Sequence, residues 1–141
     1  MNNKSGFTLV ELLAVITIIA LISLIAIPNI VGLTDGIRKD NMLDDAKRLI
    51  SIAKYQVNKD YGIRVSREHI FYFNQLNVNG DITNDPDGGN YEESVSYVKY
   101  TNDGSNIKYC IVLRGSKRHI GSSTECIDEK KLYSRKNVVD N

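Results

Sequence analysis

The chain is poor in the residues that bind transition metals. Its 141 residues include only two cysteines, Cys110 and Cys126, and two histidines, His69 and His119. A structural zinc site takes four such ligands at short characteristic spacings, and these four residues do not show those spacings. We therefore expect no metal site of this kind and no cofactor.

The sequence also lacks the short motifs that mark common enzyme active sites. It contains no G-x-S-x-G, no G-x-x-x-x-G-K-[ST] phosphate-binding loop, no H-E-x-x-H and no C-x-x-C. The two histidines lie far apart in the sequence, and neither has an obvious partner. We expect no catalytic residues and no enzymatic activity.

Charged residues are nearly absent from the first 34 positions, which carry only Lys4 and Glu11. Residues 7–27 read FTLVELLAVITIIALISLIAI, and their few polar side chains are Thr8, Glu11, Thr17 and Ser23. A helix of this length spans roughly 32 Å, and the hydrocarbon core of a bilayer is about 30 Å thick. The segment is therefore predicted to cross a membrane once, with Lys4 and the N-terminus on the cytoplasmic side.

Two ordinary explanations of this apolar segment are incomplete. A secretory signal peptide has a shorter apolar region, of about 7–15 residues, and an A-x-A-like cleavage site, which is absent before Pro28. A plain single-span anchor would explain the length but not Glu11, because an ionised carboxylate costs about 2.5–3.5 kcal/mol near the bilayer centre. Glu11 therefore needs a specific role.

The residues that precede Glu11 form a distinctive junction. Lys4-Ser5-Gly6 is followed by Phe7-Thr8-Leu9-Val10-Glu11, which resembles the N-terminus of type IV prepilins and type II secretion pseudopilins, proteins with class III signal peptides. The resemblance implies that a membrane-embedded prepilin peptidase cuts between Gly6 and Phe7 and methylates the new N-terminal residue, Phe7. It also implies that Glu11 is the hallmark acid of the family, with a role in assembly and register.

A long helix is predicted from about Phe7 to about Tyr61, with Gly62 as its C-terminal stop. Pro28, which also matches a common position in the family, has no amide hydrogen and should kink the helix. In the second half, apolar residues recur at spacings of three and four and give one apolar face: Leu43, Ala46, Leu49, Ile50, Ala53 and Val57.

Composition changes sharply along the chain. Residues 35–141 carry 17 basic and 16 acidic residues, which is typical of a soluble domain large enough for one modest core. We therefore divide the chain into a leader peptide (1–6), a hydrophobic transmembrane and assembly helix (7–28) and a globular domain (29–141). The globular domain includes the amphipathic half of the helix.

The rest of the chain predicts a small sheet. Residues 63–94 are a linker with turn signals, in which residues 69–73 fit either a short helix or a strand. Val95–Thr101 and Ile107–Leu113 are predicted to form a hairpin, followed by a short strand at residues 118–121. The predicted fold class is α+β: a long N-terminal helix, apolar and then amphipathic, packed against a small antiparallel sheet, as in pilins.

The two cysteines allow only one pairing. If the domain is exported, a disulfide between Cys110 and Cys126 is permitted and would hold the C-terminal segment to the sheet. Closing a loop of this length stabilises a protein by roughly 3 kcal/mol. The alternative is two unpaired thiols.

Three acidic residues near a glycine pair suggest a minor alternative, a calcium site at Asp81, Asp85 and Asp87. The EF-hand pattern is absent, and calcium takes 6–8 oxygen ligands, of which three are suggested here. A solvated turn is the favoured interpretation of these residues.

Charge is unevenly distributed over the predicted globular domain. Residues 81–103 carry six acids against one lysine, and residues 114–136 carry seven bases against three acids. The two stretches either neutralise each other within one subunit or pair between neighbouring subunits. The basic run at residues 117–119 is too small a footprint for a nucleic-acid partner.

Together these features favour a pilin, the structural subunit of a type IV pilus-like filament, which supports adhesion, motility or surface interaction. The expected partners are identical and related subunits, the prepilin peptidase, the membrane and assembly platform proteins, with no small-molecule substrate. The subunit is expected in the membrane before assembly and in an extracellular filament afterwards. One alternative is a pseudopilin of a type II secretion or DNA-uptake system. Another is a surface binding module that uses the apolar helix only as an anchor.

Overall fold

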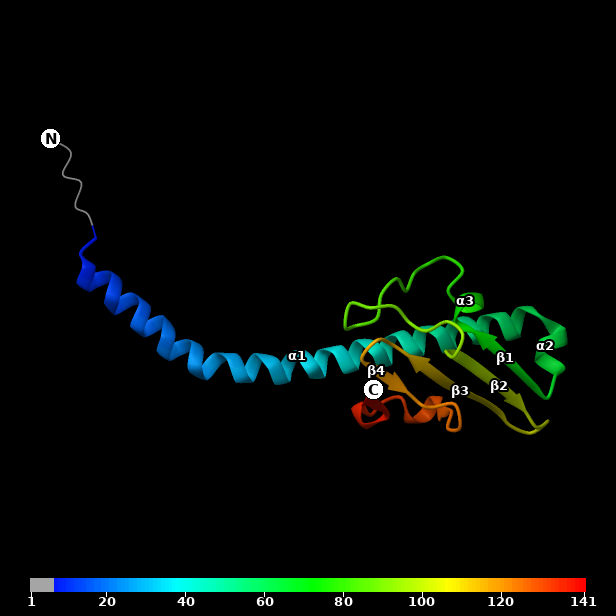
Figure 1. The fold of residues 1–141 in the computed structure, drawn as a ribbon. Coiled ribbons are helices and arrows are strands. Elements are labelled where there is room, and N and C mark those ends of the chain that lie inside the picture. Colours follow the sequence, from blue (N-terminus) through cyan, green and yellow to red (C-terminus); the bar gives the residue numbers. More distant parts are fainter. Residues whose placement is uncertain (1–6) are drawn as a thin grey trace. The chain divides into compact units, whose positions relative to one another are not determined.

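The computed structural model describes residues 7–141, apart from the side chains of residues 28 and 29. Its longest element is helix α1, from Leu9 to Lys59 (Figure 1). The chain divides into two compact units between Gly36 and Ile37, and α1 begins in the first unit and ends in the second. The boundary predicted after residue 28 states which part of the chain folds on its own, and this stays a prediction.

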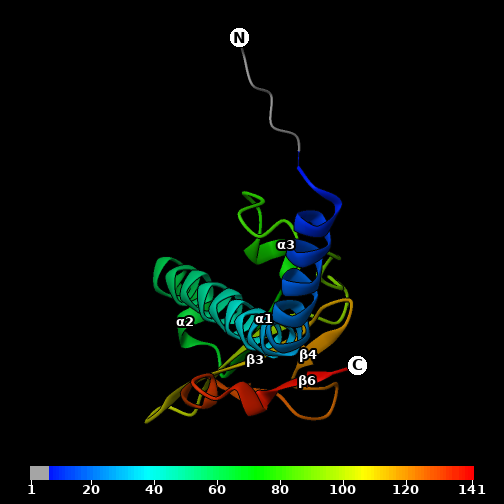
Figure 2. The ribbon, with the colours of Figure 1, turned by 90° about the vertical axis from the view of Figure 1, so that its left-hand side faces the viewer.

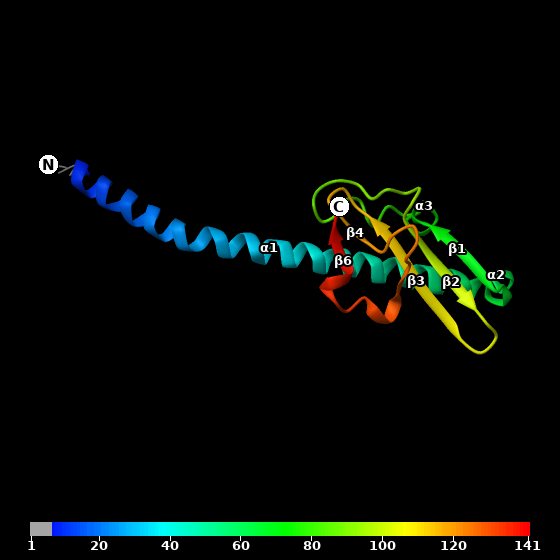
Figure 3. The ribbon, with the colours of Figure 1, turned by 60° about the horizontal axis from the view of Figure 1, so that its bottom comes forward.

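The second unit contains a six-stranded antiparallel sheet in the order β1-β2-β3-β4-β6, with β5 paired to β3. The strands are β1 Glu68–Tyr72, β2 Tyr97–Asn102, β3 Ile107–Arg114, β4 Arg118–Ile120, β5 Ile127–Asp128 and β6 Val138–Asp140. Strands β1 to β3 lie side by side and cross the second half of α1 obliquely (Figure 3). This arrangement of a long helix and a small antiparallel sheet confirms the predicted α+β, pilin-like fold class.

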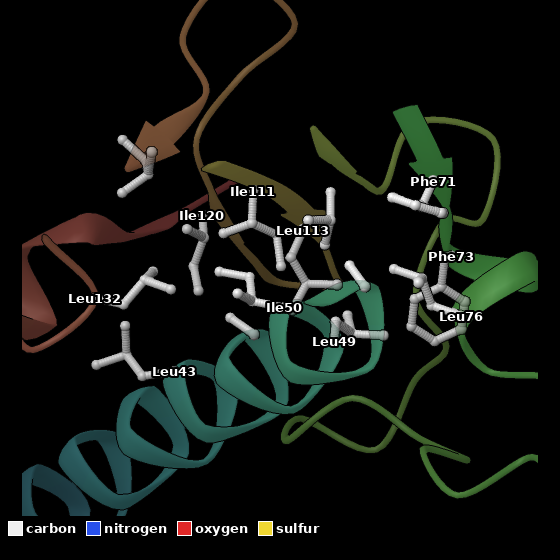
Figure 4. Close-up of a cluster of buried hydrophobic side chains, with 14 of the residues drawn as sticks. Leu43, Leu49, Ile50, Phe71, Phe73, Leu76, Ile111, Leu113, Ile120 and Leu132 are labelled. Carbon is white, nitrogen blue, oxygen red and sulfur yellow. The ribbon is translucent and has the colours of Figure 1, made fainter. Parts of the chain in front are cut away.

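The core of this unit lies between α1 and the sheet. All six residues of the predicted apolar face of α1 are buried, and Met42 joins them. Figure 4 shows Ile50 directed from the helix toward Ile111 and Leu113 of the sheet. Leu43 lies next to Leu132, and Leu49 lies on the side of Leu76, in the same core. The helical period of three to four and the strand period of two therefore present matching apolar surfaces.

The segment between α3 (Phe73–Leu76) and β2 lies on the other flank of α1, away from the sheet (Figures 1 and 2). Ile82 and Tyr91 from this segment are buried in the same core. Tyr91 Oη donates a hydrogen bond of 2.7 Å to Asp45 Oδ2 on α1. The segment is therefore fixed to the helix although it contains no regular strand.

One local expectation needs correction, and one unassigned segment gains structure. Helix α1 ends at Lys59, and Gly62 lies inside a separate short helix, α2 (Tyr61–Val65). The reason is Asp60, whose carboxylate accepts hydrogen bonds from the amides of Gly62 and Ile63 and so begins a new helix. Residues 127–140, which the sequence left unassigned, form β5, two 3-10 turns, η1 (Glu129–Lys131) and η2 (Arg135–Asn137), and β6.

Candidate functional site

The start of α1 is organised by a reciprocal pair of hydrogen bonds between Thr8 and Glu11. The Glu11 amide donates to Thr8 Oγ1 at 3.2 Å, and the Thr8 amide donates to Glu11 Oε2 at 2.9 Å. The Thr8 hydroxyl donates to the same carboxylate oxygen at 3.0 Å. This is a capping box, which satisfies backbone donors that the first turn of a helix leaves open. The T-x-x-E spacing was present in the sequence and could have predicted it.

The apolar half of α1, taken as residues 9–34, exposes its large side chains. Exposure is 83% at Leu9, 74% at Leu24 and 67% at Leu33. Within the described residues, α1 is the one helix long and apolar enough to cross a membrane, and its most apolar stretch is not buried at all. A surface of this kind is stable only against lipid or other apolar side chains.

The few hydroxyl groups in the apolar half are satisfied within the helix. Thr17, Ser23 and Thr34 donate to the carbonyl oxygens of Ala14, Ile19 and Ile30, each at 2.8 Å. In a bilayer an unpaired polar group costs several kcal/mol, so such internal bonds make the segment compatible with hydrocarbon. The described surface of this half therefore presents no unsatisfied hydroxyl to lipid.

The remaining predicted processing residues are only partly described. Gly6 lies outside the described residues. Phe7 is 85% exposed and comes immediately before the capping residue Thr8. Pro28 lies within α1, and the kink predicted there stays a prediction.

The carboxylate of Asp85 is buried and accepts hydrogen bonds from backbone amides. Asp85 Oδ1 accepts from the amides of Asp87 and Gly89, each at 2.9 Å, and Oδ2 accepts from the amide of Ser116. Gly89 is required here, since a Cβ at this position would lie 2.5 Å from Ser116 Cβ. Burial raises the pKa of Asp85, but the hydrogen bonds from Ser116, Gly89 and Asp87 outweigh it and leave the pKa below its usual range.

The carboxylate of Asp87 is bound by two arginine side chains. It accepts hydrogen bonds from Arg118 at 2.5 and 2.9 Å and lies 3.4 Å from Arg38 Nη1. Asp81 is exposed on the same segment. Across residues 7–141, no three His, Cys, Asp or Glu side chains are placed together to hold a metal ion. Calcium at Asp81, Asp85 and Asp87 stays an untested alternative, in which the ion would compete with these donors.

Cys110 and Cys126 form a disulfide, with their Cα atoms 5.5 Å apart. Cys110 belongs to β3, and Cys126 comes directly before β5, which pairs with β3 at Cys110 and Ile111. The bond therefore closes the loop at residues 121–126 against the central strand. It holds the C-terminal segment to the sheet.

Comparison with known proteins identifies the N-terminal segment. Residues 1–27 match the family model of the prokaryotic N-terminal methylation motif. This motif is the class III signal peptide of type IV pilins and pseudopilins, so the resemblance predicted from the sequence is confirmed for this segment. A search of curated proteins and a search of solved structures each found no match to the chain.

The methylation motif spans the Gly6–Phe7 junction, Glu11 and most of the apolar half of α1. It supports a precursor of the type IV pilin or pseudopilin type, which is a structural class of protein and not an enzyme. The motif and the long apolar helix are together consistent with membrane anchoring before assembly. The candidate functional site is therefore the start of α1, where the methylation motif, the capping box and the acidic side chain of Glu11 come together.

Proposed function

We propose that this chain is a pilin, the structural subunit of a type IV pilus-like filament on the cell surface. The observation that carries the proposal is the exposed apolar half of α1, most of which lies within the methylation motif. The globular unit would form the outer surface of the filament and support adhesion, motility or surface interaction. The apolar half would serve first as the membrane anchor and then as the contact between subunits.

The energetics of the apolar half support this two-stage use. Burying apolar surface contributes roughly 25 cal/mol for each Å², so moving about twenty apolar residues from lipid into water is prohibitive. A bundle of identical helices offers an apolar environment in exchange for lipid. A head-to-tail contact that does not close into a ring generates an open helical fibre.

The proposed processing also gives Glu11 a partner. Cleavage after Gly6 would create a charged amine at Phe7, and assembly would bring the carboxylate of Glu11 to the amine of a neighbouring subunit. An unpaired carboxylate in an apolar environment is costly, so the pairing would fix the axial register of the subunits. The prepilin peptidase and the assembly platform proteins are the further partners that this pathway requires.

A pseudopilin of a secretion or DNA-uptake system would share the motif, the anchor and the fold, and it is the second candidate. Electron microscopy of labelled cells separates the two, because a pilin forms long surface filaments and a pseudopilin forms short ones within the envelope. A membrane-anchored binding module would keep residues 1–6 and would not assemble.

The deciding experiment is the intact mass of the protein purified from its native membrane or filament. We expect a chain that starts at Phe7 and carries one additional methyl group. The variant Gly6→Val should remain an unprocessed precursor in the membrane fraction, because a side chain at this position prevents close approach of the peptidase to the backbone. Ser5→Ala, one residue earlier, is the matched control and should mature normally. Normal maturation of Gly6→Val would overturn the proposal.

A further inference from the structure

The face of the sheet that points away from α1 carries a cavity of about 350 Å³. Its floor includes Val112 of β3, whose direct partner on β2, Tyr97, also lines the cavity. Val112 is only 4% exposed but lies outside the core cluster, to which its neighbours Ile111 and Leu113 belong. Successive side chains of a strand point to opposite faces, so Val112 is buried by the walls of this cavity.

Two tyrosines form one wall of the cavity. The rings of Tyr72 and Tyr97 pack edge to face, with their centroids 6.4 Å apart. Tyr72 is 43% exposed, so its ring is available to a ligand. A tyrosine ring offers an apolar surface and a hydroxyl group at its tip, which suits a ligand that is apolar on one side and polar on the other.

The opposite wall is the loop at residues 121–126, from which Ser122 and Ser123 line the cavity. Gly121 begins the loop with φ +71°, and a Cβ there would lie 2.7 Å from the carbonyl oxygen of Glu125. The Ser122 amide donates to the same carbonyl at 2.8 Å, and the Cys110–Cys126 disulfide closes the loop onto β3. The wall is therefore held in place before any ligand binds, which reduces the entropic cost of binding.

The polar end of the cavity is basic. Arg114 and His119 are partners across β3 and β4, and both line it. Its lining, as the structure describes it, includes no aspartate or glutamate. Arg114 Nε lies 3.4 Å from Glu92 Oε1, which does not line the cavity. A guanidinium has five donors, so Arg114 can bind a ligand carboxylate as well, in competition with Glu92.

We propose that this cavity binds one carboxylated sugar ring. The apolar face of the ring would lie against Tyr72, its hydroxyls would bond to the Ser123 hydroxyl, and its carboxylate would bind Arg114. The cavity has the size of small-ligand sites, which are mostly apolar with a few convergent polar groups. The proposal concerns the unit from residue 37 onward and does not depend on whether the chain assembles into a filament.

The test is saturation-transfer difference NMR on the full chain in phosphocholine detergent micelles. Glucuronate should bind with a millimolar dissociation constant, since a ligand of so few atoms has little surface to bury. Glucose, which lacks the carboxylate, and cyclohexanecarboxylate, which lacks the hydroxyls, should each bind roughly ten-fold more weakly. No binding of glucuronate, or equal binding of all three compounds, would overturn the proposal, and so would tighter binding of cyclohexanecarboxylate.

Methyl β-glucuronide separates the two sources of such a ring. Binding equal to that of glucuronate indicates the terminal sugar of a glycan, and much weaker binding indicates a free sugar acid. Both results support a site for a carboxylated ring.

Three single variants test the assigned roles. Arg114→Gln should weaken glucuronate binding roughly ten-fold, because the charged partner of the carboxylate is lost. Glu92→Gln should strengthen it, because the competing carboxylate is removed. Lys117→Gln, at an exposed position near the cavity that does not line it, should leave binding unchanged. If both Arg114→Gln and Lys117→Gln weaken glucuronate binding equally, the effect comes from the net positive charge of the protein, and the role assigned to Arg114 is wrong.

Discussion

Arg118 and Asp87 form an ion pair that is closed off from solvent, with side chains 6% and 0% exposed. The pair joins β4 to the segment between α3 and β2, and Arg38 of α1 approaches the same carboxylate at 3.4 Å. A second pair, between Arg135 and Asp40, is bidentate at 2.7 and 2.6 Å but lies at the surface. The same chemistry therefore occurs in two environments of one protein.

The first prediction compares these two pairs. Asp87→Asn should lower the free energy of unfolding by about 3–5 kcal/mol, because it removes the buried counter-charge of Arg118. The acid that remains near this guanidinium, Asp140, is exposed and lies 3.9 Å away. Asp40→Asn should cost much less, since exposed pairs are screened by water and salt. Urea unfolding of the full chain in micelles, followed by tyrosine fluorescence, measures both. Equal losses would show that burial does not determine the contribution of these pairs.

The second prediction concerns acid stability and Asp85. Its pKa in the folded protein is held below the ordinary value of 3.8, so folding favours the ionised form. This contribution is fully present above pH 3.8 and is lost as the pH falls through the lower, folded-state pKa. Asp85→Asn should therefore be less stable than the wild type at pH 7, by about 2 kcal/mol. Its stability should fall less than that of the wild type below pH 3.8 in urea titrations.

Asp45 provides a control of opposite sign. Burial raises the pKa of Asp45 above 3.8, although the hydrogen bond from Tyr91 partly offsets this. The folded state then binds a proton before the unfolded state does, so stability rises as the pH falls from the folded-state pKa toward 3.8. Asp45→Asn should abolish this rise and leave the fall below pH 3.8 intact. If both variants show the same pH profile, the opposite environments assigned to these carboxylates are wrong.

The parts of the fold that the sequence predicted are those with a regular period. The apolar face of α1 and the predicted alternating face of Ile107, Tyr109, Ile111 and Leu113 are local patterns. The structure buries Leu49, Ile111 and Leu113 as expected, whereas Ile107, at the first position of β3, is exposed. The N-terminal motif is also local, which is why the Gly6–Phe7 junction could be read directly.

The parts that the sequence did not predict depend on distant partners. Asp87 looked like a member of a solvated turn, but its partner Arg118 is 31 positions away and brings it into the interior. The short strands β5 and β6 form because β3 and β4 offer open edges, and two or three residues carry too little pattern to be recognised. The cavity beside Tyr72 likewise exists only once four segments are folded together.

The third prediction tests the division of the chain. A fragment that starts at residue 29 should be soluble and monomeric in gel filtration, because its helix has one polar face and its core is complete. It retains Ile30, Val31 and Leu33, which are 59–67% exposed in the structure. A fragment that starts at residue 37, at the boundary of the compact unit, should therefore associate even less at high concentration. Large aggregates from both fragments would contradict this division.

The fourth prediction concerns the charged stretches. Within one subunit Arg114 pairs with Glu92 and Arg118 with Asp87, so part of the charge is neutralised internally. Over the described residues, however, Lys130, Lys131 and Lys136 are exposed and form no ion pair. If these lysines face an acidic stretch of the next subunit, replacing all three with glutamate should impair filament formation and leave the globular unit folded. Complementary charges favour register and association rate, and salt screens them over about 8 Å.

The control for that experiment is a variant with the same change in net charge, made outside residues 114–136. Lys59, Arg67 and Lys108, which are exposed on α1, before β1 and on β3, alter the net charge equally when they are replaced with glutamate. Electron microscopy should show normal filaments for the control and few filaments for the test variant. Filaments of the wild type should loosen as the salt concentration rises. Equal assembly of the two variants would mean that the basic stretch is a solvated surface.

The last prediction separates the two roles of Glu11, which caps its own helix in the monomer and is proposed to pair with a neighbouring amine in the filament. Glu11→Gln retains a side-chain oxygen that can complete the capping box but removes the charge. Thr8→Ala keeps the charge but loses the hydroxyl cap, which costs about 1 kcal/mol of helix stability. Both variants should insert into the membrane and be cleaved.

If charge pairing drives assembly, Glu11→Gln and Glu11→Ala should give few filaments and Thr8→Ala should give many. If capping is the whole role of Glu11, Thr8→Ala should fail and Glu11→Gln should assemble, so filament counts from the three variants decide between the two roles.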